Sequence, residues 1–271
     1  MSKKVGVGRS DRTPVKHYLL DKSLGQVCGV LSLGSYKVPC VASVRQPLIC
    51  ADLCGGDGLQ TDDHEASPVI MAKHCQFLHK RGKSAKLEVI EKASNTYEEL
   101  VRNCNHLPRE IVTLTNGDAR DYRLPKLAFN QPAFVHCDPN NVDQIPLSRP
   151  FVAGFNKFTT YLVTLGCNVG GLKRSTPEKR AQWFEYVSML VEVLPNHHDA
   201  ILFWLNRDSA KWAYLLSIPK VWGDDFAGKA ITQTNKMWTQ GVSAVSYRSQ
   251  PAVFNDELKQ LFLTKKEYAN I

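Results

Sequence analysis

The chain has 271 residues, of which 43% are hydrophobic and 22% are charged, a composition typical of globular proteins. It contains no apolar run of the roughly 18 residues that a membrane span needs, and its basic N-terminus lacks the apolar segment of a secretory signal. The net charge of +8 favours a polyanionic partner such as nucleic acid, and eight cysteines scattered through apolar runs predict reduced thiols in a cytoplasmic protein.

The N-terminal segment is basic. Residues 1–16 carry five basic side chains and one acidic side chain, so we predict a mobile arm, which by its charge could also contact phosphate. A helix is expected over residues 17–33, interrupted at Gly25 and Gly29. Residues 34–47 contain glycine and proline and are expected to form a loop or a short edge strand.

A strand, a glycine-rich turn and a helix follow in series. Residues 48–53 form an apolar run that predicts a buried strand, and three glycines between positions 55 and 58 make a turn after it. An apolar helical pattern then runs from Pro68, which suits a first helical turn, to about Lys80. Such a unit is expected in a doubly wound sheet, where ligands bind at the carboxyl ends of the strands.

The alternation of strands and helices continues along the chain. Further strands are predicted at residues 86–90, 110–115, 133–137, 158–165, 200–205 and 242–247, and further helices from Ser94, at 176–194 and at 255–268. The spacings suit right-handed crossovers between parallel strands. We therefore predict an α/β fold, namely a Rossmann-like, mostly parallel, seven-stranded sheet with helices on both faces.

Acidic residues follow four of the predicted strands, at Asp52, Glu91, Asp118 and Asp138. Because the carboxyl ends of parallel strands meet at one edge of a sheet, these side chains are expected to surround one ligand. The glycine turn excludes two ligand classes. A P-loop needs Gly-Lys-Ser/Thr, whereas Leu59 and Gln60 follow Gly58, and the dinucleotide fingerprint Gly-x-Gly-x-x-Gly is not matched either.

The pattern Asp-x-x-x-Gly-x-Gly, from Asp52 to Gly58, resembles the first motif of class I methyltransferases that use S-adenosylmethionine (AdoMet). The resemblance implies AdoMet as the cofactor, with Glu91 on the ribose hydroxyls and Asp118 on the adenine amino group. A carboxylate can accept hydrogen bonds from both ribose hydroxyls. The cofactor-binding residues implied in this way are Asp52, Cys54, Gly56, Gly58, Glu91 and Asp118.

A narrower resemblance covers roughly residues 17–140. The strings DLCGGDG and ASPV, then VIEK at 89–92 and FVHCDP at 134–139, are similar to motifs of the three-Cys-motif partner (TcmP) family. The chain departs from that family at Asp57, where the family has proline, and after Pro139, where Asn-Asn replaces Phe-Gly. The resemblance therefore implies a fold and a cofactor more than a reaction.

The residues after the fourth strand suggest a reaction. Asp138-Pro139-Asn140 resembles the Asp/Asn-Pro-Pro-aromatic motif of amino-directed nucleic-acid methyltransferases, without its second proline and its aromatic residue. The resemblance implies that Asp138, Pro139 and Asn140 are catalytic. It also implies that the Asp138 side chain accepts a hydrogen bond from the target amino group. The predicted substrate is a base nitrogen of nucleic acid, with DNA favoured over RNA.

Two alternatives stay open at this point. The first is that the chain is a methyltransferase-fold partner or binding protein with little catalysis of its own, which would have a protein partner. The departures after Asp138 motivate this alternative. The second is that the chain is a methyltransferase for a protein or a small molecule. No membrane partner is expected, because the chain has no apolar run of sufficient length.

No metal site is predicted. Cys50 and Cys54 have no third cysteine or histidine at ligand spacing, so they are expected to be buried thiols, and the acidic loop 57–65 is expected to be solvated. After the arm, one domain is predicted over residues 17–271. It is divided into a helical addition, a cofactor-binding half and a substrate half, at 17–47, 48–140 and 141–271.

Overall fold

The computed structural model describes residues 13–33, 46–59, 65–128, 130–139, 154–155, 158–165, 176–193, 198–204, 213–219 and 243–262. The chain divides into two compact units. Unit 1 comprises Met1–Cys137 with Gly154–Thr159, and unit 2 comprises Asp138–Ala153 with Thr160–Ile271.

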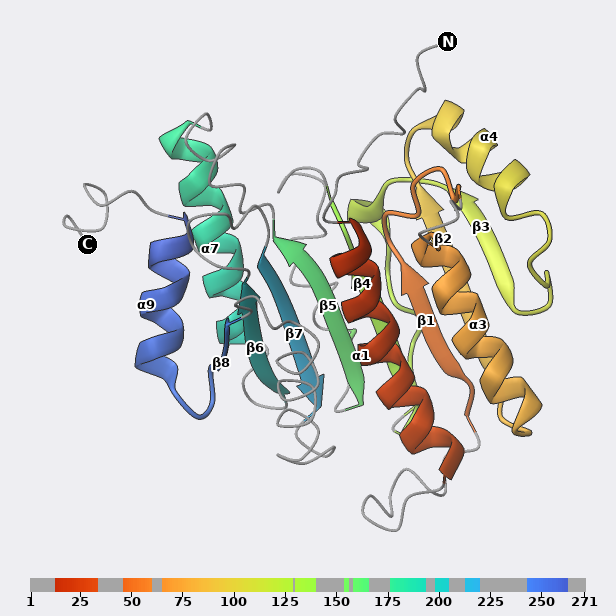
Figure 1. Ribbon diagram of the computed structural model, residues 1–271, viewed down its shortest axis with the longest axis horizontal. Helices are drawn as coiled ribbons and strands as arrows, with labels where there is room; N and C mark the ends of the chain where they lie inside the picture. Colours follow the sequence, from red (N-terminus) through yellow and green to blue (C-terminus); the bar gives the residue numbers. More distant parts are fainter. Residues whose placement is uncertain are drawn as a thin grey trace. The chain divides into compact units, whose positions relative to one another are not determined.

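Unit 1 contains a parallel sheet whose strands run in the order β3-β2-β1-β4. The strands are β1 (Leu48–Asp52), β2 (Ala85–Glu91), β3 (Val112–Asn116) and β4 (Ala133–Cys137). The central strand β1 pairs with β2 on one side and β4 on the other (Figure 1). All five residues of β4 are buried, as expected for a parallel strand covered on both faces.

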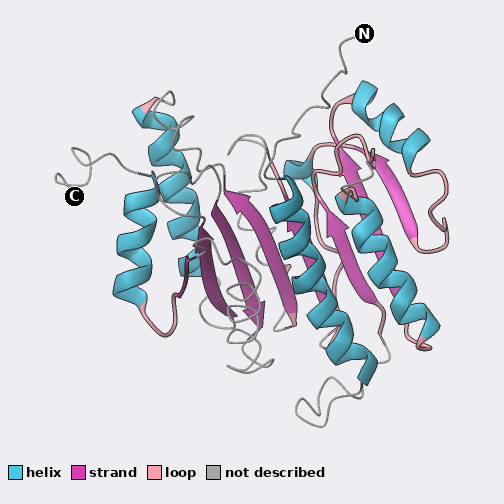
Figure 2. Ribbon diagram, viewed as in Figure 1, coloured by secondary structure: helices cyan, strands magenta, loops and turns pink. Residues whose placement is uncertain are grey.

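Two helices of unit 1 connect its strands. Helix α3 (Ser67–Lys80) joins β1 to β2 and packs against both, and α4 (Ser94–Asn103) joins β2 to β3 and packs against both (Figure 2). Helix α4 begins at Ser94, as predicted, but Ser94 is not its N-cap. The N-cap is Ala93, and the Ser94 hydroxyl donates instead to Oδ1 of Asn116 on β3. A single 3₁₀ turn, Ala119–Asp121, follows β3.

Helix α1 (Thr13–Leu33) lies alongside α3. It begins at Thr13, inside the segment predicted to be a mobile arm, and it continues through Gly25 and Gly29, where an interruption was predicted. Packing explains the glycine at position 25. A Cβ added there would lie 3.1 Å from Cε1 of His74 on α3, so the missing side chain lets the two helices approach closely.

Unit 2 contains four strands in the order β5-β7-β6-β8, and all three of these pairings are antiparallel. The strands are β5 (Thr159–Leu165), β6 (His198–Trp204), β7 (Ala213–Pro219) and β8 (Ser243–Ser246). Helices α7 (Pro177–Val193) and α9 (Pro251–Phe262) pack against each other. The helix predicted at 255–268 therefore begins earlier, with Pro251 in its first turn.

Strand β7 was not predicted, so the described residues hold eight strands in place of the expected seven. All seven residues of β7 are buried, and the strand pairs with β5 on one side and β6 on the other. Its sequence, AYLLSIP, therefore lacks the alternation of a half-buried strand, and a short apolar run cannot be told from a buried helix segment by periodicity.

The predicted α/β, Rossmann-like class is confirmed. The parallel pairing expected of such a sheet is found in unit 1, whereas the pairings within unit 2 are antiparallel. Among the helices that the structure describes, none is both long and apolar enough to cross a membrane.

Candidate functional site

The glycine turn lies directly after β1, at the carboxyl edge of the unit 1 sheet. Gly56 and Gly58 have φ values of +62° and +63°, in the left-handed region that favours glycine. A Cβ on Gly58 would lie 2.6 Å from Sγ of Cys104 and 2.8 Å from Cδ1 of Leu100, so Gly58 is packed against the end of α4. A Cβ on Gly56 would meet no atom of the described residues within 4 Å, so among these residues the backbone faces open space that a ligand can enter.

Glu91, the last residue of β2, reaches the glycine turn. Its Oε2 accepts from the backbone N–H of Gly56 at 3.1 Å, and its Oε1 accepts from the N–H of Ala93 at 2.9 Å. A carboxylate offers about four acceptor sites, so these two bonds leave about two for a ligand. Glu91 therefore fixes the turn while keeping the capacity to accept from a pair of hydroxyls.

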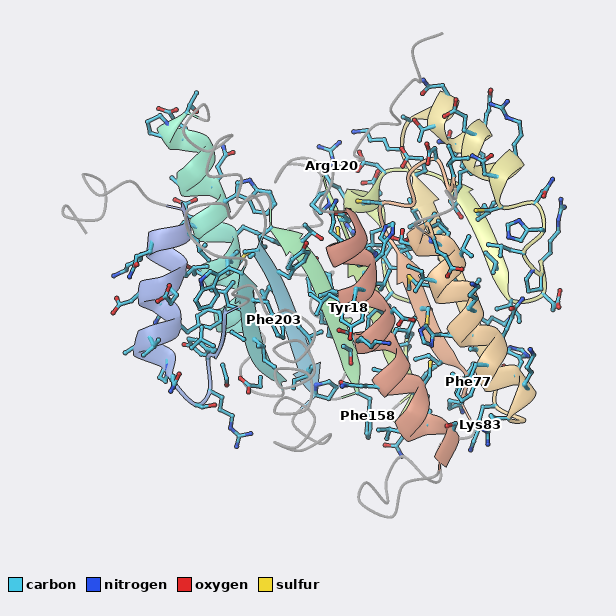
Figure 3. The ribbon with its side chains drawn as sticks, in the orientation of Figure 1. Tyr18, Phe77, Lys83, Arg120, Phe158 and Phe203 are labelled. Atoms are coloured by element: carbon cyan, nitrogen blue, oxygen red, sulfur yellow. The ribbon has the colours of Figure 1, made fainter. Side chains whose placement is uncertain are left out.

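Asp118 follows β3 and holds two cations. Its carboxylate accepts from Arg120 Nη2 at 2.6 Å and from Lys92 Nζ at 2.8 Å. The Arg120 hydrogen bond, opposed in part by burial and reinforced by Lys92, holds the pKa of Asp118 well below its ordinary value. Figure 3 shows Arg120 at this edge of unit 1, and Lys83 at the opposite edge, where β2 begins.

Asp52, the last residue of β1, is fully buried and points away from solvent. Its Oδ1 lies 3.0 Å from Nδ1 of His136, its register partner on β4, and His136 is 3% exposed. The sequence placed His136 in a packed strand, and the structure adds that its ring is the partner of an acid. Asp52 can therefore act on a ligand only through the turn above it.

Asp57, which departs from the TcmP pattern, has a local role in the turn. Its Oδ1 accepts from the N–H of Leu59 at 3.0 Å, as in an Asx turn, and its carbonyl accepts from Nδ2 of Asn103 at 2.8 Å. Its side chain therefore shapes the turn between β1 and α3. The remainder of the predicted acidic loop, residues 60–64, lies outside the described residues.

Two cysteines meet at the same edge. Sγ of Cys54, in the glycine turn, lies 3.9 Å from Sγ of Cys137, the last residue of β4. Cys54 is partly exposed and Cys137 is buried. Of the three predicted catalytic residues, Asp138 is partly exposed and Pro139 buried directly after β4, whereas Asn140 lies outside the described residues.

Asn116 is a site residue that sequence reasoning missed. It ends β3 in register with Glu91. Its Nδ2 donates to the backbone carbonyls of Glu91 at 2.8 Å and Lys92 at 3.2 Å, so it fixes the chain as it leaves β2. The sequence did hold a signal for this role, namely an amide residue at the carboxyl end of the third strand. Ligands of such sheets bind at the carboxyl ends of the strands.

The predicted site residues of unit 1 thus lie around one sheet edge, with Gly56, Glu91 and Asp118 presenting polar groups and Asp52 beneath them. Among the described residues, no group of three or more His, Cys, Asp or Glu side chains is arranged to hold a metal ion.

No family model matches the chain, and no curated protein matches it. Solved structures with a related arrangement include a precorrin-6y C5,15-methyltransferase from Geobacter metallireducens, which is 8% identical with a TM-score of 0.38 over 80% of this chain and 92% of that one. An rRNA methylase from Streptococcus thermophilus is 11% identical with a TM-score of 0.44, over 78% of this chain and 99% of that one. An O-methyltransferase from Bacillus cereus, in complex with SAH, is 12% identical with a TM-score of 0.40, over 76% of this chain and 97% of that one.

At identities of 8% to 12%, these similarities concern the fold alone and say nothing about a reaction or a substrate of this chain. None of the comparisons supports the resemblance to the TcmP family.

Proposed function

We propose that the protein is an AdoMet-dependent methyltransferase whose cofactor binds at the carboxyl edge of the unit 1 sheet. The observation that carries the proposal is the Gly56–Glu91 contact. It joins the open glycine turn after β1 to an acid after β2, and the acid retains acceptor sites. Bound AdoMet would supply a methyl group on a positively charged sulfur.

The residues present fit this cofactor. Glu91 has acceptor capacity for the two ribose hydroxyls, and no side chain that the structure describes lies in front of the backbone at Gly56. The Asp118 carboxylate accepts from the backbone N–H, Nε and Nη2 of Arg120 and from Nζ of Lys92, so a contact with the adenine amino group would require one of these cations to move aside. Asp52 and Cys54 contribute by holding the turn.

Calorimetric titration with AdoMet and with S-adenosylhomocysteine tests the cofactor. We expect both to bind, and Glu91→Ala to weaken binding by about tenfold or more, as expected when two hydrogen bonds to a charged group are lost. Glu88→Ala is the matched control. Glu88 lies on the same strand but bonds Thr115 in the sheet, so the affinity should change little. Absence of binding by both compounds contradicts the proposal.

The substrate that we propose is a base nitrogen of nucleic acid, with DNA favoured. The net charge of +8 and Asp138-Pro139 after β4 support this class. In such a reaction the Asp138 carboxylate accepts a hydrogen bond from the target amino group and so orients the nitrogen lone pair. Asp138 follows β4 directly and is partly exposed as a residue, with its Oδ1 buried.

Transfer of tritiated methyl from AdoMet to separate pools of DNA, RNA and protein tests the substrate. Label in DNA that disappears with Asp138→Ala, while AdoMet still binds, supports the proposal. Label in protein alone contradicts it. If AdoMet binds but no pool is labelled, the chain is a methyltransferase-fold binding protein, the alternative that the missing aromatic residue after Pro139 favours.

A further inference from the structure

Unit 1 contains two pairs of thiols at nearly equal separations. Sγ of Cys54 lies 3.9 Å from Sγ of Cys137, and Sγ of Cys75 lies 3.8 Å from Sγ of Cys50. A disulfide bond is about 2.05 Å long, so either pair must close by roughly 2 Å to be oxidised. The separation alone does not distinguish the two pairs.

The two thiol pairs differ in their exposure to solvent. Cys54 is partly exposed in the glycine turn, whereas Cys50 is 1% exposed and Cys75 is 0% exposed in the core between β1 and α3. A hydrogen bond with Cys75, together with burial, also raises the pKa of the Cys50 thiol well above its ordinary value, so little of the reactive thiolate forms there. Only the Cys54 pair therefore offers a sulfur to an oxidant in solution.

We propose that Cys54 and Cys137 form an oxidisable dithiol that closes to a disulfide across the carboxyl ends of β1 and β4. On the turn side, Cys54 lies outside the strand, two residues after the end of β1 and two residues before Gly56. The β4 side is fixed, because Cys137 ends a fully buried strand. Closure therefore moves the turn toward β4 and leaves the strand in place.

The oxidant is a hydroperoxide such as hydrogen peroxide. The Cys54 thiolate attacks one peroxide oxygen, the O–O bond breaks, and hydroxide leaves, which forms a sulfenic acid. The Cys137 sulfur then attacks the Cys54 sulfur, its proton leaves with the sulfenic oxygen as water, and the S–S bond forms. Two thiols and one hydrogen peroxide thus become one disulfide and two waters. The second step is internal, so the buried Cys137 needs no contact with solvent.

The modification also acts on the site, and this part of the inference rests on the proposed function. Pulling Cys54 toward Cys137 displaces the turn that presents the N–H of Gly56 to Glu91. We expect the oxidised protein to bind AdoMet roughly tenfold more weakly than the reduced protein, as for the loss of one or two hydrogen bonds. Treatment with dithiothreitol should restore the affinity.

The experiment uses the full chain treated with hydrogen peroxide, then denatured and alkylated with iodoacetamide. The disulfides are next reduced and the released thiols labelled with N-ethylmaleimide. Peptide mapping should find the maleimide on Cys54 and Cys137, and iodoacetamide on Cys50 and Cys75. Maleimide on Cys50 and Cys75 at equal or lower peroxide doses overturns the inference.

A Cys137→Ala variant keeps the attacking thiol and removes the resolving one. After peroxide treatment, Cys54 should be captured by dimedone as a sulfenic acid in this variant, and the wild type should show much less adduct. Equal dimedone labelling of both proteins overturns the inference. These readouts need no AdoMet, so they separate failure of the dithiol from failure of the proposed cofactor.

Discussion

Nδ1 of His136 lies 3.0 Å from Oδ1 of Asp52, and the two side chains are 3% and 0% exposed. They join the last residue of β1 to its register partner on β4, directly beneath the glycine turn. No described residue donates a hydrogen bond to the other carboxylate oxygen of Asp52. His136 is therefore the one described side chain that compensates the burial of this acid.

Replacing His136 by alanine should lower the free energy of unfolding by about 3 kcal/mol, because it leaves a buried acid without its partner. Urea unfolding followed by circular dichroism measures the loss. His74→Ala is the matched control, since His74 pairs with Asp21 at 2.9 Å but the Asp21 side chain is 41% exposed. That variant should lose less than about 1 kcal/mol. Equal losses would contradict a special role for the buried pair.

The two left-handed glycines should respond differently to alanine. Both substitutions strain the backbone by about 1–2 kcal/mol. Gly58→Ala also drives a methyl group into Cys104 and Leu100, so it should destabilise the protein by a further 1–3 kcal/mol or so. Gly56→Ala places its methyl group in open space and should mainly weaken AdoMet binding. Thermal unfolding should show the larger loss of stability in Gly58→Ala, and calorimetry should show the larger loss of AdoMet affinity in Gly56→Ala. The prediction fails if Gly56→Ala is the less stable variant.

Asp118 should make stability depend on pH in the acid range. Its folded pKa lies below the ordinary value of 3.8, because Arg120 and Lys92 hold the carboxylate. The contribution of Asp118 to the free energy of unfolding is therefore complete above about pH 4. It is lost as the pH falls below that value, because the unfolded state then takes up a proton that the folded state does not.

The Lys92 and Arg120 side chains are 58% and 51% exposed, so the contribution of Asp118 is about 1 kcal/mol. Asp118→Asn should be less stable than wild type by that amount at pH 7, and the difference should shrink toward pH 2. Asp121→Asn, an exposed acid in the following turn, is the control. A difference that grows on acidification would have the wrong sign.

Leu100 anchors α4 beneath the glycine turn. It is 0% exposed, and its Cδ1 would lie 2.8 Å from a Cβ on Gly58. Leu100→Ala should cost about 3 kcal/mol and loosen the turn, so AdoMet should also bind more weakly. Val101→Ala, at a residue that is 36% exposed on the same helix, should cost less than about 1 kcal/mol and leave binding unchanged. Urea unfolding and calorimetry test both effects.

Strand–turn–helix periodicity was sufficient to predict the strands of unit 1. The parallel strands β1 and β2 are mostly buried, so each appears as a short, mainly apolar run that ends in an acid, at Asp52 and Glu91. In unit 2 the same rule missed β7, because periodicity alone does not distinguish a short apolar run such as AYLLSIP from a buried helix segment. The start of α1 was missed because its first residues, Thr13 to Lys16, were assigned to the basic arm by the net charge of that segment.

The site was predictable as a set of residues but not as a set of contacts. Glycines and acids at strand ends follow from backbone conformation and sheet topology, which act locally. The hydrogen-bond partners of those acids cannot be predicted from local features in the same way. The Asp52–His136 pair, for example, joins residues 84 positions apart in the chain. Only the register of β1 against β4 brings them together, and a single sequence does not specify register directly.

The return of the chain to unit 1 at Gly154–Thr159 has a consequence for synthesis. Within that unit, the backbone N–H of Ala133 donates to the carbonyl of Phe158 at 3.4 Å, and Phe158 is 1% exposed. A ribosome therefore releases β1 to β4 before this buried aromatic ring exists. Until Phe158 is synthesised, the N–H of Ala133 on β4 lacks this hydrogen-bond partner. A strand edge with unpaired backbone groups can pair with another chain and so promote self-association. A fragment that stops at Cys137 would keep that exposed edge permanently.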